Sequence, residues 1–256
     1  MIPRVIPCLL LKDGGLVKTI RFAEPRYVGD PINTVRIFND KQVDEIVLLD
    51  ISATPEGRAP DERSIEAIAS EAFMPMAYGG GVGDLASATR LIQLGVEKVI
   101  LNTVAVDRPH VVAEIVAKLG SSTTVVSIDA ARQPNGTYEV LVAGGRRRTG
   151  IDVVDHARAM AEIGAGELLV TAVDRDGTME GYDTELLGAI ARSVPIPVIA
   201  SGGAASLEDI AAMIGRTGVA AAAAGSLFVF HGRHRAVLVN YPSYDRRVAA
   251  FATTRP

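Results

Sequence analysis

Two short clusters of glycine, each with a hydroxyl residue nearby, could bind an anion. The first is "GGGV" at residues 79–82, followed by "NT" at 102–103, and the second is "SGGA" at 201–204, followed by "GS" at 225–226. Glycine lets the backbone approach a ligand closely, and free N–H groups beside a hydroxyl at a short helix N-terminus attract phosphate. These glycines could instead form only tight turns, but their recurrence in both halves favours binding. We therefore predict a ligand with two phosphates.

Five charged residues follow apolar runs, and we expect them to lie between the two clusters in space. They are Lys18, Asp129, Asp174, Arg175 and Asp176. Any one of them could be a solvated loop charge. Because chemistry in a parallel barrel collects where the strands end, together they predict a polar mouth above an apolar barrel.

Four other charges stand at the beginnings of apolar runs. They are Arg4, Glu45, Lys98 and Glu167. At the opposite end of a barrel they could form a surface ion-pair network, which contributes little to stability. The alternative is a ring of alternating charge around the barrel axis that controls the passage of a small polar molecule. The residue types alone leave both interpretations open.

Eight short apolar runs alternate with helical patterns and must position these residues. The runs are residues 4–10, 44–50, 74–80, 97–103, 123–130, 167–174, 196–203 and 219–225. Apolar residues recur at helical spacing in 32–41, 61–71, 85–94, 110–119, 153–163, 184–192 and 207–214. Buried strands that alternate with helices predict an α/β fold, a single (β/α)8 TIM barrel. An open doubly wound sheet is the alternative, although the glycine triplet follows the third strand and is not GxGxxG.

The two halves of the chain resemble each other, which favours a barrel built from two similar half-barrels. Glu45 is matched by Glu167, and "YGGGV" is matched by "SGGA", about 120 residues later. The same register places Leu10, at the end of the first strand, opposite Asp129, at the end of the fifth.

The composition excludes several classes of function. With 256 residues, 48% of them hydrophobic, we expect one domain over 1–256. A net charge of −4 offers no basic surface for nucleic acid, and no apolar stretch is long enough for a membrane span. A single cysteine, Cys8, and no apparent signal peptide fit a cytoplasmic protein. The four histidines lie apart or in an unusual tail, so we predict no metal site and no cofactor.

Several motifs together resemble the HisF family, the cyclase subunit of imidazole glycerol phosphate synthase. They include "IPCL", "KDG", "IDA", "DRDGT" and "ASGGA", and the resemblance spans about 4–230. It implies a (β/α)8 barrel that pairs with HisH, a glutaminase, and receives ammonia along the barrel axis. The four charges at the strand beginnings match the family's salt-bridge gate, so the resemblance favours the ring.

The resemblance also implies a set of ligand-binding residues. Phosphate binding is assigned to Gly81, Asn102, Thr103, Gly203 and Ser226, with Lys18 and Asp176 at the mouth. The family's cyclisation needs an aspartate at the end of strand one and another at the end of strand five. Asp129 is the second of these, but the first position holds Leu10, which has no proton to transfer. General acid–base catalysis typically contributes ~10²- to 10⁴-fold, so we expect cyclisation to be badly impaired.

The tail from about residue 231 also departs from the family, because "HGRHRAVLVNYPS" replaces the expected final amphipathic helix. These departures resemble HisF paralogues encoded with surface-polysaccharide genes, in which ammonia is delivered to a separate amidotransferase that builds acetamidino groups on sugars. The leading hypothesis is therefore an ammonia-transfer subunit with a HisH-like glutaminase as partner. The alternatives are a cyclase of histidine biosynthesis, with Asp129 as acid–base, and a scaffold that binds a phosphorylated ligand.

Overall fold

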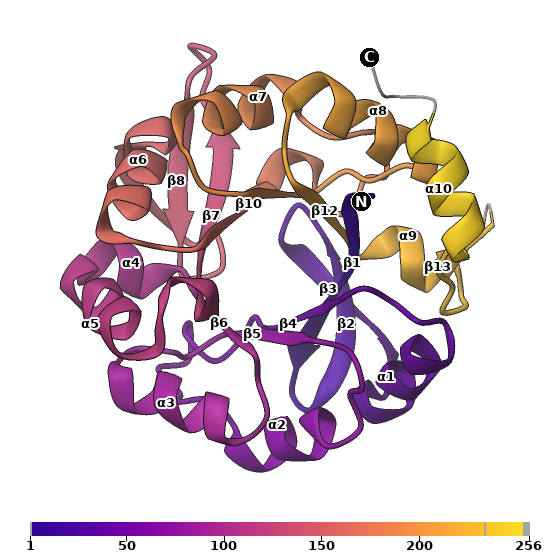
Figure 1. Ribbon diagram of the computed structural model, residues 1–256, viewed down its shortest axis with the longest axis horizontal. Coiled ribbons are helices and arrows are strands. Elements are labelled where there is room, and N and C mark those ends of the chain that lie inside the picture. The colour runs from indigo at the N-terminus through magenta and orange to yellow at the C-terminus, as the bar shows by residue number, and fades with distance from the viewer. Residues whose placement is uncertain (1, 233, 253–256) are drawn as a thin grey trace.

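Eight parallel strands close into a barrel, as the sequence predicts. The computed structural model describes residues 2–232 and 234–252. Around the barrel, the strands are β1 (Arg4–Lys12), β4 (Ile46–Asp50), β5 (Met76–Gly79), β6 (Lys98–Leu101), β7 (Thr124–Arg132), β10 (Glu167–Ala172), β11 (Val198–Ser201) and β12 (Ala221–Ala224). β12 pairs in parallel with β1, with Ala221 opposite Arg4, and this pairing closes the ring. The open doubly wound sheet is excluded (Figure 1).

Helices on the outside of the barrel connect consecutive strands (Figure 1). They are α1 (Pro31–Asp40), α2 (Glu62–Ala69), α3 (Leu85–Gln93), α5 (Pro109–Leu119), α6 (Val153–Ile163), α7 (Thr184–Ser193) and α8 (Leu207–Thr217). Their boundaries lie within a few residues of those predicted. Side chains such as Asp30 before α1 and Ser206 before α8 accept a hydrogen bond from a first-turn N–H, which fixes where the helix begins.

Short helices follow the fourth and the eighth barrel strands, at the two glycine and hydroxyl clusters. They are α4 (Thr103–Asp107) and α9 (Ser226–Val229), and each begins at the hydroxyl residue of its cluster. Two 3₁₀ turns, η1 (Ser121–Thr123) and η2 (Val173–Arg175), complete the connections. The short helices expected from the sequence are therefore present at both clusters.

The first strand of each half continues into an antiparallel hairpin at the mouth of the barrel. β2 (Gly15–Ile20) and β3 (Ala23–Gly29) follow β1. β8 (Tyr138–Val142) and β9 (Arg147–Asp152) follow β7. This equivalence agrees with two similar half-barrels.

The expectation that the tail lacks a final helix is wrong. A two-stranded hairpin, β13 (Phe230–His231) with β14 (Ala236–Val237), comes first, and α10 (Tyr244–Ala252) then packs against the barrel near α8 (Figure 1). Arg247 and Phe251 are its buried residues. The apolar "VLVNYP" segment before α10 interrupts the helical spacing, which is why the sequence pattern concealed a helix that starts later.

Alternate residues of each strand face two separate apolar layers. The layer between strands and helices contains large side chains such as Phe38, Leu48 and Tyr78. The layer inside the barrel contains fewer residues, and three of them are alanines. A cavity of about 530 Å³ lies outside the barrel, beside α1 and α2, and none of the predicted site residues lines it. Among the described residues, none of the helices combines the length and the hydropathy needed to cross a membrane.

Candidate functional site

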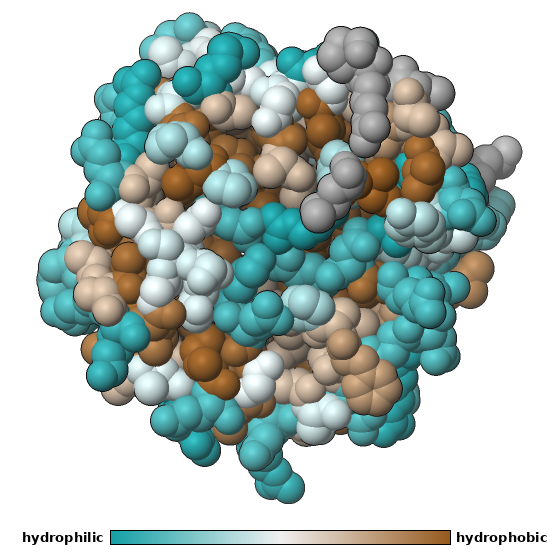
Figure 2. Space-filling model, viewed as in Figure 1, coloured by the Kyte–Doolittle hydropathy of each residue, from teal (hydrophilic) through white to brown (hydrophobic). Residues whose placement is uncertain are grey.

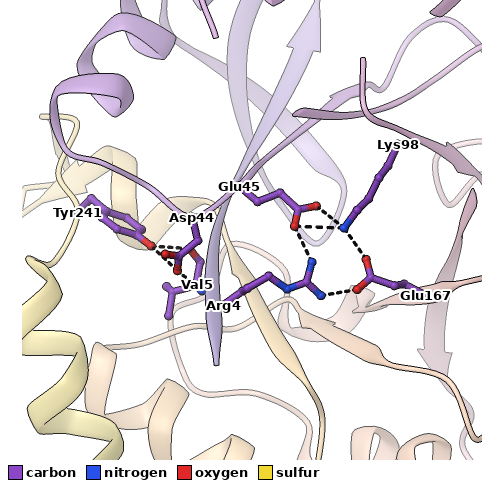
Figure 3. A network of polar contacts seen from close by, with 7 residues as sticks. All are labelled: Arg4, Val5, Asp44, Glu45, Lys98, Glu167 and Tyr241. Carbon is purple, nitrogen blue, oxygen red and sulfur yellow. Dashed lines mark hydrogen bonds and ion pairs between the residues drawn. The ribbon is translucent and has the colours of Figure 1, made fainter. Parts of the chain in front are cut away.

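A closed ring of four charged side chains lies at the end of the barrel where the strands begin. Arg4 and Lys98 start β1 and β6. Glu167 starts β10, and Glu45 directly precedes β4. Arg4 Nη1 lies 2.6 Å from Glu45 Oε2, and Arg4 Nη2 contacts Glu167. Lys98 Nζ lies 3.1 Å from Glu45 Oε1 and 2.8 Å from Glu167 Oε2 (Figure 3). Each carboxylate therefore contacts both cations.

The ring is too buried to be an ordinary surface ion-pair network. The exposed fraction of the side chain is 4% for Glu45, 13% for Glu167, 15% for Lys98 and 31% for Arg4. Burial alone would raise the pKa of the Glu167 carboxyl, but hydrogen bonds from Arg4 and Lys98 outweigh it and hold that pKa below its ordinary value. Figure 2 faces this end of the barrel and shows hydrophilic surface gathered at its centre. Removing one partner of such a buried ion pair strongly destabilises the protein, because it leaves the other charge buried without a partner.

The layer of the barrel interior next to the ring is apolar. It is lined by Ile6, Cys8, Val47, Ala77, Ile100, Val125, Leu169, Ile199, Ala221 and Ala223, with Leu10 and Leu49 packed against them. An ion would lose its hydration there without gaining a partner, whereas a small neutral molecule would not carry that cost. This layer therefore favours a neutral molecule over an ion, and the same strands bury the hydroxyls of Ser127, Thr171 and Ser201 nearer the mouth.

A narrow pocket of about 30 Å³ lies at the opposite end, where the strands finish. Gly203 and Ser226 of the second cluster line it together with Lys18, Asp176 and Leu10. Lys18 is 6% exposed, and its Nζ donates to the Cys8 carbonyl oxygen at 2.5 Å. Burial lowers the pKa of the Lys18 ammonium. The pocket thus presents a buried cation beside a glycine-rich turn.

Two carboxylates, Asp129 and Asp176, influence each other at the mouth. Asp129 is 9% exposed, and burial together with the nearby Asp176 charge raises its pKa to about 7. Asn102 Nδ2 donates to Asp129 Oδ2 at 3.2 Å and partly opposes this shift. Burial also raises the pKa of Asp176, although Thr19 Oγ1 donates to it at 2.9 Å. A carboxyl that titrates near neutral pH can give or take a proton.

Polar groups of the first cluster form hydrogen bonds with other parts of the protein. The Gly81 N–H donates to Thr54 Oγ1 at 3.2 Å. Thr103 Oγ1 accepts a hydrogen bond from the Ala143 N–H at 3.0 Å, so the turn between β8 and β9 covers this cluster. The second cluster lines the pocket and the first does not.

Leu10 faces the mouth, as the register with Asp129 predicts. It pairs with Val17 in the hairpin and with Leu49 in β4, and its side chain lines the pocket next to Asp176. The apolar side chains of Leu10 and Leu49 pack against the barrel interior. Of these two equivalent strand ends, β7 therefore carries a carboxylate, Asp129, and β1 carries the hydrocarbon side chain of Leu10.

Three residues at the mouth were not predicted from the sequence. Thr19 bonds Asp176, and its position directly after Lys18 could have indicated it. Thr54 and Ala143 cover the first cluster, and nothing in their residue types signals this contact.

Comparison with known proteins gives the family. A family model described as "Histidine biosynthesis protein" matches residues 4–235. The chain is 46% identical to "Putative imidazole glycerol phosphate synthase subunit HisF" of Leptospira interrogans over 250 residues, which cover 97% of this chain and 98% of the relative. It is 49% identical to "Putative imidazole glycerol phosphate synthase subunit hisF2" of Pseudomonas aeruginosa over 243 residues, which cover 95% and 97%. The chain belongs to the HisF family.

The family model covers the barrel of this HisF-family chain but not its last helix. The match stops at residue 235, so all the site residues predicted from the sequence lie inside it and α10 lies outside it. Within the parts of the chain that the structure describes, no group of three or more His, Cys, Asp or Glu side chains is arranged to hold a metal ion.

Proposed function

We propose that this HisF-family barrel is an ammonia-transfer subunit whose ring binds against a HisH-like glutaminase. The observation that carries this proposal is a contrast between the two ends of the barrel. The ring is complete and buried, whereas Leu10 occupies the position of a catalytic carboxylate. Selection for an ammonia entrance would keep the ring, and selection for cyclisation would keep the aspartate. The relatives named as synthase subunits support a partner protein.

Ammonia would travel from the ring to the mouth as a neutral molecule. The side chains of the ring touch one another directly, so at least one ion pair must separate to admit it. The two ring carboxylates balance the two ring cations, so the exclusion of ammonium rests on the cost of desolvation in the apolar layer beyond the ring. Ala77 and the alanines of β12 contribute short side chains to the lining of the interior. Binding of the glutaminase would supply the free energy that opens the ring.

The product ammonia would leave at the mouth, beside Asp129 and Asp176, toward an acceptor enzyme. The departures from the family that the sequence shows favour an amidotransferase that forms acetamidino groups on surface-polysaccharide sugars as this acceptor. A phosphorylated ligand could occupy the pocket at Gly203, Ser226 and Lys18. Its binding would then signal to the partner proteins that the mouth is occupied.

The direct test uses the purified barrel and a HisH-like glutaminase from the same organism. Their co-elution and the rate of glutamine hydrolysis are measured with and without the barrel. We expect a complex and faster hydrolysis. A barrel that neither binds nor stimulates the glutaminase would refute the proposal.

One observation favours a second function, cyclisation in histidine biosynthesis. The pKa of Asp129 is raised to about 7, which suits an acid–base group at neutral pH. Asp176, whose charge contributes to the raised pKa of Asp129, would then have to replace the missing strand-one aspartate. Turnover of the bis-phosphorylated intermediate with ammonium salt alone would establish this function.

A further inference from the structure

The C-terminal segment reaches the ring through Asp44, the residue next to Glu45. Asp44 Oδ2 accepts a hydrogen bond from the Val5 N–H at 3.2 Å and lies 2.5 Å from Arg247 Nη1. The Tyr241 hydroxyl lies 2.7 Å from the Val5 carbonyl oxygen and 3.2 Å from Asp44 Oδ2 (Figure 3). We call Val5, Asp44, Tyr241 and Arg247 the Asp44 clamp.

The two tail residues of the Asp44 clamp are fixed by their packing. Arg247 is 4% exposed, and its guanidinium carbon lies 5.1 Å from the Tyr241 ring centroid and 5.7 Å from that of Tyr244. Tyr241 is 9% exposed, and its ring lies 5.3 Å from that of Phe228 in α9. A buried guanidinium needs its carboxylate partner, so the pair with Asp44 is expected to stay closed.

The Asp44 clamp acts on the backbone beside two ring residues. Val5 follows Arg4, and Asp44 precedes Glu45. The clamp therefore ties the first residues of β1 to the residue that leads into β4, its neighbour in the barrel. The 2.6 Å contact between Arg4 and Glu45 depends on that spacing.

We propose that Tyr241 and Arg247 are positioning residues for the ring, which hold Arg4 between Glu45 and Glu167 by fixing Val5 and Asp44. This inference rests on the proposed function only in so far as the ring is the entrance for ammonia. Neither residue contacts the ring side chains, so both act through the backbone. Arg247 and Tyr241 lie beyond the residues that the family model matches, but within the span aligned with the Leptospira interrogans relative.

Glu167 provides a readout that distinguishes positioning from simple stabilisation. Its side chain bonds Arg4 and Lys98 and no member of the clamp. Its pKa is held low by those two bonds, against the effect of burial. If Arg4 moves away, the Glu167 pKa must rise, whereas a loss of global stability alone leaves the pKa of the folded protein unchanged.

The experiment compares Tyr241→Phe and Arg247→Met with Tyr244→Phe and Arg246→Met in the full chain. Tyr241→Phe removes the hydroxyl and keeps the ring on Phe228, so it is expected to fold with a melting temperature about 2–4 °C lower. The Glu167 carboxyl is titrated by carbon-13 NMR in each folded variant. We expect its midpoint to rise in both clamp variants and to stay unchanged in both controls. A folded Tyr241→Phe protein with an unchanged Glu167 midpoint would overturn the proposal, even if Arg247→Met fails to fold.

Measuring glutamine hydrolysis in the complex tests the proposed function independently of the positioning role of Tyr241 and Arg247. If the wild-type barrel stimulates the glutaminase, we expect Tyr241→Phe to change the kcat for glutamine more than the KM, because the ring and not the glutamine site is altered. If the wild-type barrel gives no stimulation, the proposed function fails. The Glu167 titration still decides whether the clamp positions the ring.

Discussion

At the scale of single residues, the mouth has a leucine at the end of β1, where the equivalent strand of the other half, β7, carries Asp129. Asp129 is a buried acid with a pKa near neutral pH, and Leu10 contributes only hydrocarbon to the same pocket wall as Asp176. Lys18 adds a buried cation held by the Cys8 carbonyl. The mouth thus combines a buried cation and a buried acid with an apolar side chain at the end of β1.

The raised pKa of Asp129 predicts a pH-dependent stability. The folded-state pKa is about 7, whereas an unfolded Asp titrates near about 3.9, so the folded protein binds the extra proton between these values. Stability therefore falls as the pH rises from about 4 to 7 and stays reduced above it. Asp129→Asn, which cannot ionise, should be more stable than wild type at pH 8, by about 2–4 kcal/mol, with a smaller difference at pH 5.

Urea unfolding of both proteins at the two pH values measures this difference. Asp13→Asn, whose side chain in the wild type is 72% exposed, is the control and should change stability little at either pH. An Asp129→Asn effect of the same size at pH 5 and pH 8 would contradict the assigned pKa.

At the scale of elements, the turn between β8 and β9 contacts the first glycine and hydroxyl cluster through one hydrogen bond. The Ala143 N–H bonds Thr103 at the start of α4, and Ala143 takes a positive φ of 55° to do so. Gly144 and Gly145 continue the left-handed turn with φ of 65° and 77°. This conformation suits glycine, so the turn is built to fold over the cluster.

Thr103→Val should loosen this turn, because it removes the oxygen that accepts the Ala143 N–H. We expect a loss of about 1 kcal/mol in the free energy of unfolding and faster amide exchange in residues 143–146. Ala143→Gly is the matched control, since it keeps the N–H and relieves the positive φ. Hydrogen-exchange mass spectrometry measures both, and equal exchange in Thr103→Val and wild type would show that the contact does not hold the turn.

At the scale of the whole molecule, each end of the barrel exposes a large aromatic side chain. Phe73 lies between α2 and β5, on the end that carries the ring, and is 86% exposed. Tyr27 of β3 is 66% exposed on the hairpin at the mouth. A large exposed aromatic side chain is typical of an interface anchor.

Phe73→Asp should therefore weaken the binding of a HisH-like glutaminase. We expect a loss of about 30-fold or more in affinity, corresponding to a hot-spot residue of about 2 kcal/mol. Tyr27→Asp places the same substitution at the opposite end and should leave affinity unchanged. Isothermal titration calorimetry compares the two, and equal weakening by both would place the partner elsewhere.

The sequence predicts the barrel and most of its site because both rest on local patterns. Strand ends place Asp129 and Leu10 at one edge, and strand beginnings place Arg4 and Glu167 at the other. The contacts of Tyr241 with Val5 could not be predicted, since they join residues at the two ends of the chain and depend on packing. For the same reason, residue types alone did not reveal that Ala143 covers Thr103.

We propose that this barrel transfers ammonia without catalysing cyclisation. The most direct measurement incubates the wild-type barrel and Leu10→Asp, with Leu10→Asn as the uncharged control, in ammonium salt and the bis-phosphorylated histidine-pathway intermediate. We predict no cyclised product from wild type or Leu10→Asn, and a gain in Leu10→Asp within the ~10²- to 10⁴-fold range of acid–base catalysis. Rapid turnover by the wild-type barrel would contradict the account and establish a cyclase.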